Sequence, residues 1–465
     1  MGQIGRRALL AGAAGGAMAA LLAACTGPEG ETTFRPARTA TPVTTARAGG
    51  TTAPAVIVNP TDVPAAHPVG TVFPTAKKGA PVPDLPRMLG LVPNEQDVTG
   101  GLLAFLTRWK GTLSFANLAD VKKLYGYENV RSSSDLQAQN IKLTDYTNAT
   151  NGCYLTEFTG ALASQGEYRD AFGYDVYQMD REISAGQPQD YFSRMEGVFD
   201  AGMIVAKLQA GGYATADQNG VPYYTTRGDS EISFADPRTR LALGRMNRVA
   251  ASAERVIAAP TTVLIAAALD AEAKRITALD GSATLRAFTT TLSGVTSMVT
   301  FPPGASDVVE AVLQPQQIAA TTRGWGTLHV PELQAMGYTD AGQFRRTMHV
   351  ALVYTNPSDA AADAPELVKR ITGYRLIRSQ QTLLPTYATA VTSRTATVGS
   401  KGVLIADITL MPDPARGRLW IDMFQSRDTL FLVPQPVSAT GTPPPITPAA
   451  GGSARPATPR ASGTP

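Results

Sequence analysis

Residues 323–329 group three side chains that could recognise a ligand. The sequence Arg-Gly-Trp-Gly-Thr-Leu-His places Trp325 between two glycines, with Arg323 and His329 close by. A tryptophan in a loop beside an arginine is a typical anchor for a ligand or a protein partner. The alternative is a tryptophan that fills the edge of the hydrophobic core. We therefore take Arg323, Trp325 and His329 as candidate binding residues.

Tyrosines point to a second recognition surface. Eleven of the fifteen tyrosines lie between Tyr125 and Tyr224. Rings that combine apolar area with a hydroxyl suit sugars and protein partners. Tyrosine also favours strands for structural reasons, so an ordinary β-rich segment is the alternative explanation.

Local catalytic motifs are absent from the sequence after residue 25. It contains no G-x-S-x-G, S-x-x-K, H-E-x-x-H, C-x-x-C, G-x-x-x-x-G-K-[ST] or G-x-G-x-x-G pattern. We therefore predict no catalytic residue and no cofactor, and the sequence favours a non-enzymatic protein. The alternative is a hydrolase whose site is assembled from distant residues, with His329 or His349 as its base.

The residues that usually bind metals are poorly placed. The chain has three histidines, isolated from one another: His67, His329 and His349. Asp359, Asp363 and Glu366 could form part of a calcium loop, but they lack the 12-residue frame and the glycine of an EF-hand. Helix capping explains these carboxylates better, so we expect no metal site.

Only two cysteines occur, Cys25 and Cys153. If Cys25 is modified, Cys153 has no partner for an intramolecular disulfide. A free cysteine is usually buried and inert, so we expect a buried thiol at Cys153 rather than a nucleophile.

The charge balance argues against nucleic-acid binding. The whole chain has 41 basic and 38 acidic residues, but nine of the basic and three of the acidic ones lie in residues 1–78 and 435–465. The remaining core therefore has 32 basic and 35 acidic residues. No basic run exists there of the kind that nucleic acid requires.

Three segments show helix-capping patterns: 120–126, 200–212 and 363–373. Each begins with an aspartate that could cap the helix, and each ends in a glycine followed by a tyrosine. We expect strands at 192–199, 349–354 and 374–378, and a hairpin over 213–225 that turns at 217–220. Further apolar runs predict strands at 261–269, 402–410, 419–424 and 430–433, and helices at 283–299 and 307–313.

These patterns predict an α+β fold in two lobes that contain β-α-β units and mixed or antiparallel sheets. The Phe-Pro-Pro-Gly sequence at 301–304 is the best internal boundary, which gives lobes over 83–304 and 305–435. The β-α-β pattern in both halves is a weak internal repeat or only a common motif. Residues 25–82 and 436–465 are rich in Thr, Ala, Pro and Gly, and we expect a disordered tether and a disordered tail there.

The N-terminus has the features of an export signal. Residues 8–22 are uncharged and follow Arg6 and Arg7. As a helix this stretch would span about 22 Å, short of the ~30 Å hydrocarbon core of a bilayer. A charged start, a short apolar stretch and small residues before a cleavage point are typical of a signal peptide, here residues 1–24.

The residues Leu22-Ala23-Ala24-Cys25 resemble the lipobox of bacterial lipoprotein precursors. The resemblance implies that the Cys25 thiol receives a diacylglyceryl group and that cleavage makes Cys25 the new N-terminus. Two or more acyl chains bind a membrane stably. An ordinary secretory peptide with a chance cysteine is the alternative.

The sequence Arg6-Arg7-Ala-Leu-Leu also looks like a twin-arginine signal, which implies export of the folded protein. Gly5 and Ala11 depart from the usual pattern, and general secretion stays open. We therefore expect an extracytoplasmic protein, lipid-anchored to the bacterial cell membrane, that binds a ligand or an envelope partner. A small molecule, a glycan or another envelope protein fits, whereas nucleic acid does not. A hydrolase with a dispersed site, or a structural or adhesion protein, is the alternative.

Overall fold

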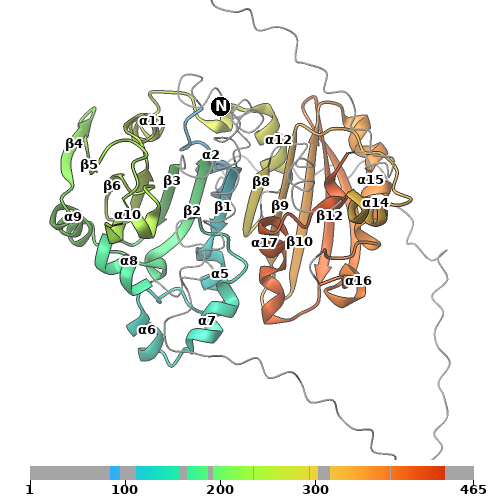
Figure 1. The fold of residues 1–465 in the computed structure, drawn as a ribbon, viewed down its shortest axis with the longest axis horizontal. Helices are drawn as coiled ribbons and strands as arrows, with labels where there is room; N and C mark the ends of the chain where they lie inside the picture. Colours follow the sequence, from blue (N-terminus) through green and yellow to red (C-terminus); the bar gives the residue numbers. More distant parts are fainter. Residues whose placement is uncertain are drawn as a thin grey trace, which may run out of the picture. The chain divides into compact units, whose positions relative to one another are not determined.

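The computed structural model describes residues 84–94, 112–156, 165–186, 192–233, 235–292, 294–301, 315–377 and 379–434 (Figure 1). The signal residues Arg6, Arg7, Leu22, Ala23 and Ala24, the lipidation candidate Cys25 and the expected tether and tail lie outside these ranges. The fold below belongs to the compact unit that begins at Ala66.

The described strands form one antiparallel sheet of twelve strands. Its order is β11-β12-β10-β9-β8-β1-β2-β3-β7-β6-β5-β4. The first half of the chain contributes β1 (Thr112–Asn117), β2 (Met179–Gly186), β3 (Phe192–Gly197), β4 (Ala214–Gln218), β5 (Val221–Thr225), β6 (Arg248–Ala251) and β7 (Arg255–Ala259). The second half contributes β8 (Ser297–Phe301), β9 (Leu333–Asp340), β10 (Arg346–Tyr354), β11 (Ala388–Val398) and β12 (Lys401–Leu410). The α+β class is therefore confirmed.

Helices cover both faces of the sheet. Successive side chains of a strand point to opposite faces, so each face contributes to its own hydrophobic core. Ala116 of β1 belongs to one core and its neighbour Phe115 to the other. The first core includes α5 (Leu118–Tyr125), α6 (Ser133–Ala138), α7 (Leu143–Thr150), α8 (Gln165–Phe172), α9 (Ala201–Ala210), α10 (Pro237–Ala242), α14 (Pro315–Thr321), α15 (Pro357–Thr372), α16 (Leu383–Thr386) and α17 (Leu419–Gln425). The second includes α2 (Asp84–Leu89), α11 (Thr262–Glu272) and α12 (Ala283–Thr291).

The two halves of the sheet share one topology. In each half, three strands that are neighbours in sequence order pair one after another, and a helix follows the third. The last strand of the half then pairs with that third strand: β7 with β3 in the first half, and β12 with β10 in the second. The helix is α9 in the first half and α15 in the second, and both contribute to the same core. The first strands of the halves, β1 and β8, pair antiparallel in the middle of the sheet. The similar strand order, with seven strands in one half and five in the other, is consistent with an internal repeat and with a motif used twice.

The expected boundary at 304 falls between β8 and β9, which are hydrogen-bonded neighbours. The sheet therefore continues across this boundary.

Several local predictions are confirmed. Asp200 caps α9 by accepting a hydrogen bond from the Met203 amide at 2.9 Å, and Gly212 takes a left-handed φ of +81°. The hairpin over 213–225 forms with its turn at the expected place, and strands occur within 192–199, 349–354 and 402–410.

Other local predictions are wrong. Residues 261–269 form most of α11, capped by Thr261, residues 419–424 lie in α17, and residues 430–432 form a 3₁₀ turn. A short apolar run has no periodicity that separates a strand from a helix. Within the described residues of the strand expected at 374–378, only Arg375 pairs, in an isolated bridge with Thr382. The helix expected at 283–299 ends at Thr291, and residues 297–301 form β8. Asn117, not Asp120, caps α5. The expected helix at 307–313 lies outside the described residues.

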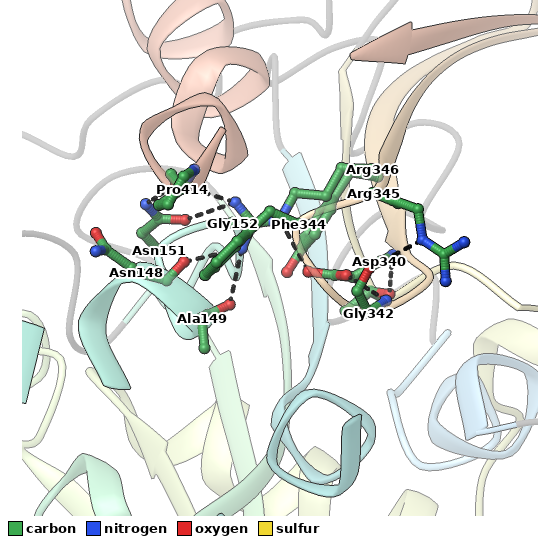
Figure 2. Close-up of polar contacts among 12 residues, drawn as sticks. Asn148, Ala149, Asn151, Gly152, Asp340, Gly342, Phe344, Arg345, Arg346 and Pro414 are labelled. Carbon is green, nitrogen blue, oxygen red and sulfur yellow. Dashed lines mark hydrogen bonds and ion pairs between the residues drawn. The ribbon is translucent and has the colours of Figure 1, made fainter. Parts of the chain in front are cut away.

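A buried arginine joins the halves (Figure 2). Arg346 at the start of β10 donates from Nε to Asp340 Oδ2 at 2.8 Å, and both side chains are fully buried. Its Nη2 donates to the carbonyls of Asn148 and Ala149, at the end of α7, at 2.8 and 3.2 Å. Its Nη1 donates to the Pro414 carbonyl at 3.1 Å. One guanidinium thus connects the second half of the sheet to a helix of the first half.

No helix among the described residues is both long enough and apolar enough to cross a membrane.

Candidate functional site

The candidate segment 323–329 lies along α15, which holds its backbone with charged side chains. Glu366 Oε1 accepts from the Gly326 amide at 2.6 Å, and Asp363 Oδ2 accepts from the His329 amide at 2.8 Å. Lys369 Nζ donates to the Gly324 carbonyl at 2.8 Å, and Arg370 donates to the Gly326 carbonyl. These carboxylates therefore neither cap a helix nor form a calcium loop, because they lie within α15 and bind a neighbouring segment.

Trp325 packs at the edge of the core. Its side chain is half-buried, and the Arg370 guanidinium lies 5.2 Å from the centre of its ring. The ring of Tyr374 lies 6.4 Å away. Arg323 is exposed beside it. The structure brings the three candidates onto one ordered segment, and their part in binding stays a prediction.

His329 forms an ion pair with the helix. Its Nδ1 lies 2.7 Å from Asp363 Oδ1, and 53% of its side chain is exposed. The hydrogen bond and the charge of Asp363 raise the pKa of the imidazole. Asp363 itself is almost fully buried and also accepts a hydrogen bond from the Tyr354 hydroxyl at 2.8 Å. The expectation that Asp363 begins a helix is wrong, since α15 begins at Pro357.

A second candidate site is a charged cavity of about 510 Å³. It lies where β2 begins, β3 ends and β7 begins, on the face that α2 and α11 cover. Four arginines line it: Arg87, Arg181, Arg194 and Arg255. Four acidic side chains line it as well: Asp180, Glu196, Glu254 and Glu272.

Ion pairs hold these arginines in place. Arg87 forks onto Glu196, with Nη1 to Oε1 at 3.0 Å and Nη2 to Oε2 at 2.5 Å. Arg255 donates from Nε to both oxygens of Glu272, at 2.7 and 2.9 Å. Burial opposes ionisation of Glu196 and Glu272, but the arginines outweigh it and hold the pKa of both carboxyls below the usual range. These ion pairs therefore favour the ionised form of Glu196 and Glu272.

The arginines keep hydrogen-bonding capacity that the protein does not use. Within the described residues, Arg255 bonds only through Nε, and Arg181 contacts only Asp84 through Nε, at 2.9 Å. Arg194 is 7% exposed, and its Nη1 lies 3.2 Å from Glu272 Oε1 without forming a hydrogen bond. Among the lining carboxylates, Asp180 is also shared with Lys122 and Arg131. The lining thus balances four arginines against four carboxylates, and Arg181, Arg194 and Arg255 keep donors that no described residue uses.

His349 lies elsewhere, on the strands of the second half. Its Nδ1 lies 2.7 Å from Asp407 Oδ1, and its Nε2 lies 2.8 Å from Thr339 Oγ1. Arg394 donates to the other oxygen of Asp407 at 2.8 Å. His349 is 8% exposed, and neither histidine lines the charged cavity.

The expected buried thiol is confirmed. Cys153 is buried 3.5 Å from the Tyr338 hydroxyl, and burial raises its pKa to about 12. In the part of the chain that the structure describes, no three His, Cys, Asp or Glu side chains are grouped to hold a metal ion.

The sequence analysis missed the charged cavity. Its residues come from α2, β2, β3, β7 and α11, and no spacing in the sequence connects them. The one signal was the alternation in β3, where Arg194 and Glu196 share a face with the buried Phe192. Charges at inward positions of a strand indicate a paired cluster or a site.

Comparisons with known proteins give no family. No protein-family model matches the chain, and no curated protein sequence is similar to it. Among solved structures, it is similar to the one described as "Structure of crystal form I of TP0453", over 72% of this chain and 96% of that chain. The sequence identity is 10% and the TM-score is 0.29, so this likeness carries no inference about function.

Proposed function

We propose that this chain is a lipid-anchored extracytoplasmic binding protein, without catalytic activity, that binds small anions in the arginine-lined cavity. The lipobox-like sequence at Cys25 supports the anchor and the location. The cavity supports binding, and the observation that carries this proposal is the set of unused donors on the arginines that line it.

The chemistry of the lining favours an anion over a neutral or cationic ligand. Glu196 and Glu272 already accept from arginines through both oxygens, so they have little capacity left for a cation. The Nη groups of Arg181 and Arg255 have donors left, and a carboxylate or phosphate accepts two such hydrogen bonds in parallel. Because the ion pairs fix the arginines before binding, little side-chain entropy remains to be lost.

Thermal unfolding of the full chain tests the proposal. Phosphate, succinate and citrate are compared with sodium chloride at equal ionic strength, and with glucose and choline. We expect at least one of the three anions to raise the melting temperature, since a ligand at about 100 times its dissociation constant stabilises by about 2.7 kcal/mol. Arg255→Gln should remove most of this shift.

Arg275→Gln is the matched control. Arg275 pairs with Asp270 of α11, the helix that also carries Glu272, but Arg275 does not line the cavity. It should leave the shift intact. If none of the anions stabilises the chain, or if Arg275→Gln removes the shift as fully as Arg255→Gln does, the proposed cavity function is wrong.

A hydrolase is the second candidate, and one arrangement favours it. Asp407, His349 and Thr339 form a hydrogen-bonded chain in the order of an orienting acid, a base and a nucleophile. Hydrolysis of p-nitrophenyl acetate by the full chain tests it. A rate above the buffer rate that both Thr339→Val and His349→Gln abolish, and His329→Gln does not, would support an esterase. If the protein shows no such rate, the hydrogen bonds among Asp407, His349 and Thr339 have a purely structural role.

A further inference from the structure

The edge strand β11 has few of the features that usually protect a sheet edge. It is eleven residues long, and no described strand other than β12 pairs with it. Natural proteins protect such edges with short strands, prolines, charged side chains (lysine above all), β-bulges or covering segments. The strand Ala-Thr-Ala-Val-Thr-Ser-Arg-Thr-Ala-Thr-Val contains no proline and no lysine. Its only irregularity is a shift in register at its start, between Ala388 and Ala390.

The charge on this edge is neutralised within the molecule. Arg394 is the only charged residue of β11, and it turns to Asp407 on β12, with Nε to Oδ2 at 2.8 Å. Its Nη1 donates to the Thr291 carbonyl at 3.4 Å. Lys401 at the start of β12 is paired with Glu332 at 2.6 Å. A second edge of the same composition would therefore meet no like-charge repulsion.

The opposite edge of the sheet is different. β4 has five residues, less than half the length of β11. It carries Asp217, which accepts from the Gly220 amide at 2.8 Å in the turn to β5. A short edge with a carboxylate offers few backbone groups and repels its own copies. Among the described residues, the sheet therefore has one short, acidic edge and one long edge that no further strand pairs with.

We propose that β11 is an interface between two copies of this chain, paired antiparallel across a two-fold axis. The strand suits self-pairing because threonine, alanine and valine lie on both sides of Ser393, its middle residue, and cross-strand pairs of such residues are favourable. The contact uses the same patch on both copies, so it closes as a dimer. Pairing of β11 with β4 would instead add copies without end, and the short, acidic β4 opposes it.

The same geometry already exists inside the molecule. β1 and β8, the first strands of the two topological halves, pair antiparallel in the centre of the sheet. A β11–β11 pair would extend the sheet by the same kind of contact. A strand pair buries less surface than most stable interfaces, so we expect a reversible dimer with a dissociation constant in the micromolar range.

Sedimentation velocity over a range of concentrations tests the dimer. The full chain carries Cys25→Ser, so that no lipid or detergent affects its mass. We expect a monomer–dimer equilibrium, and we expect Thr392→Lys with Thr397→Lys to weaken it by about tenfold or more, which is about 1.4 kcal/mol. Both threonines are exposed on β11. Thr215→Lys on the exposed face of β4 is the matched control and should leave the dimer intact.

A crosslink makes the result independent of how well the lysine variants fold. Thr392→Cys in the same background should give a dimer with a short thiol-to-thiol crosslinker, and Thr215→Cys should not. Cys153 does not interfere because it is buried. A chain that stays monomeric at all concentrations, larger oligomers, or equal crosslinking from Thr215→Cys would each overturn the proposal.

Discussion

Arg346 shows how one side chain can fix the packing of several elements. Its guanidinium is fully buried, pairs with Asp340 and donates to three backbone carbonyls from two other segments. Asp340 is in turn held by the Tyr125 hydroxyl at 3.1 Å and by the Gly342 amide at 2.8 Å. A buried ion pair of this kind stabilises a fold only when both partners are present.

Replacing Arg346 should therefore strongly destabilise the protein. Arg346→Met leaves the Asp340 carboxylate and three carbonyls without their donor in a buried site. We expect the free energy of unfolding in urea to fall by about 3–5 kcal/mol. Arg345→Met, at the exposed neighbouring position, should change it by about 0.5 kcal/mol or less. Equal effects of the two substitutions would contradict the structural role of Arg346.

His329 should make the attachment of residues 323–329 depend on pH. Asp363 raises its pKa, so the ion pair contributes its full stability below the unfolded pKa of about 6.5 and loses it as pH rises through the folded value. An NMR titration should give His329 a pKa above about 6.5. Asp363→Asn should lower that pKa, whereas Asp359→Asn should change it less, because Asp359 lies 3.9 Å from Nε2. A His329 pKa that does not respond to Asp363→Asn would contradict this interpretation.

At the scale of elements, α15 does two things at once. One side of the helix packs on β11 and β12, and the charged side chains of Asp363, Glu366 and Lys369 hold the backbone of 324–329. Gly402 at the start of β12 permits the close packing. A Cβ at this position would lie 2.6 Å from Pro357 Cα and 2.8 Å from the Asn356 carbonyl oxygen, where α15 begins.

Gly402→Ala should therefore push the start of α15 away from the sheet. We expect a loss of about 1–3 kcal/mol in the free energy of unfolding, typical of overpacking against backbone atoms. Gly166→Ala in α8 is the control, since a Cβ there meets nothing within 4 Å. Alanine favours a helix over glycine, so this variant should gain up to about 1 kcal/mol. Thermal or urea unfolding of the two variants compares them directly.

Local signals predict some of these elements and not others. Asp200 and Gly212 mark the ends of α9, because a carboxylate cap and a left-handed glycine act within a few residues of the chain. The run at 261–269 misled because an apolar stretch of nine residues has no periodicity that separates a helix from a strand, and Val263 is in fact 55% exposed. The sequence signal for a helix was Thr261, a residue type that caps helices, and in the structure its hydroxyl accepts from the Leu264 amide at 3.2 Å.

At the scale of the whole molecule, the sheet order depends on contacts that no local pattern encodes. The pairing of β1 with β8 joins residues far apart in the chain, and so does the pairing of β3 with β7. The charged cavity arises only from that order, because Arg194 and Arg255 come together when β3 and β7 become neighbours. The sequence predicted a β-α-β pattern in both halves, as a weak repeat or a common motif, but it did not predict the antiparallel contact between β1 and β8.

The anchor gives the last prediction, which concerns where the whole chain is found. If Cys25 carries a diacylglyceryl group and a further acyl chain, the protein should sediment with membranes. Two or more acyl chains hold a protein stably on a bilayer, whereas a protein without them lacks this anchor. Cys25→Ser should shift it to the soluble or secreted fraction. Cys153→Ala is the matched control: this thiol is buried in the folded core and should not affect membrane retention. Retention of the Cys25→Ser protein would show that the membrane holds the chain by something other than lipid on Cys25.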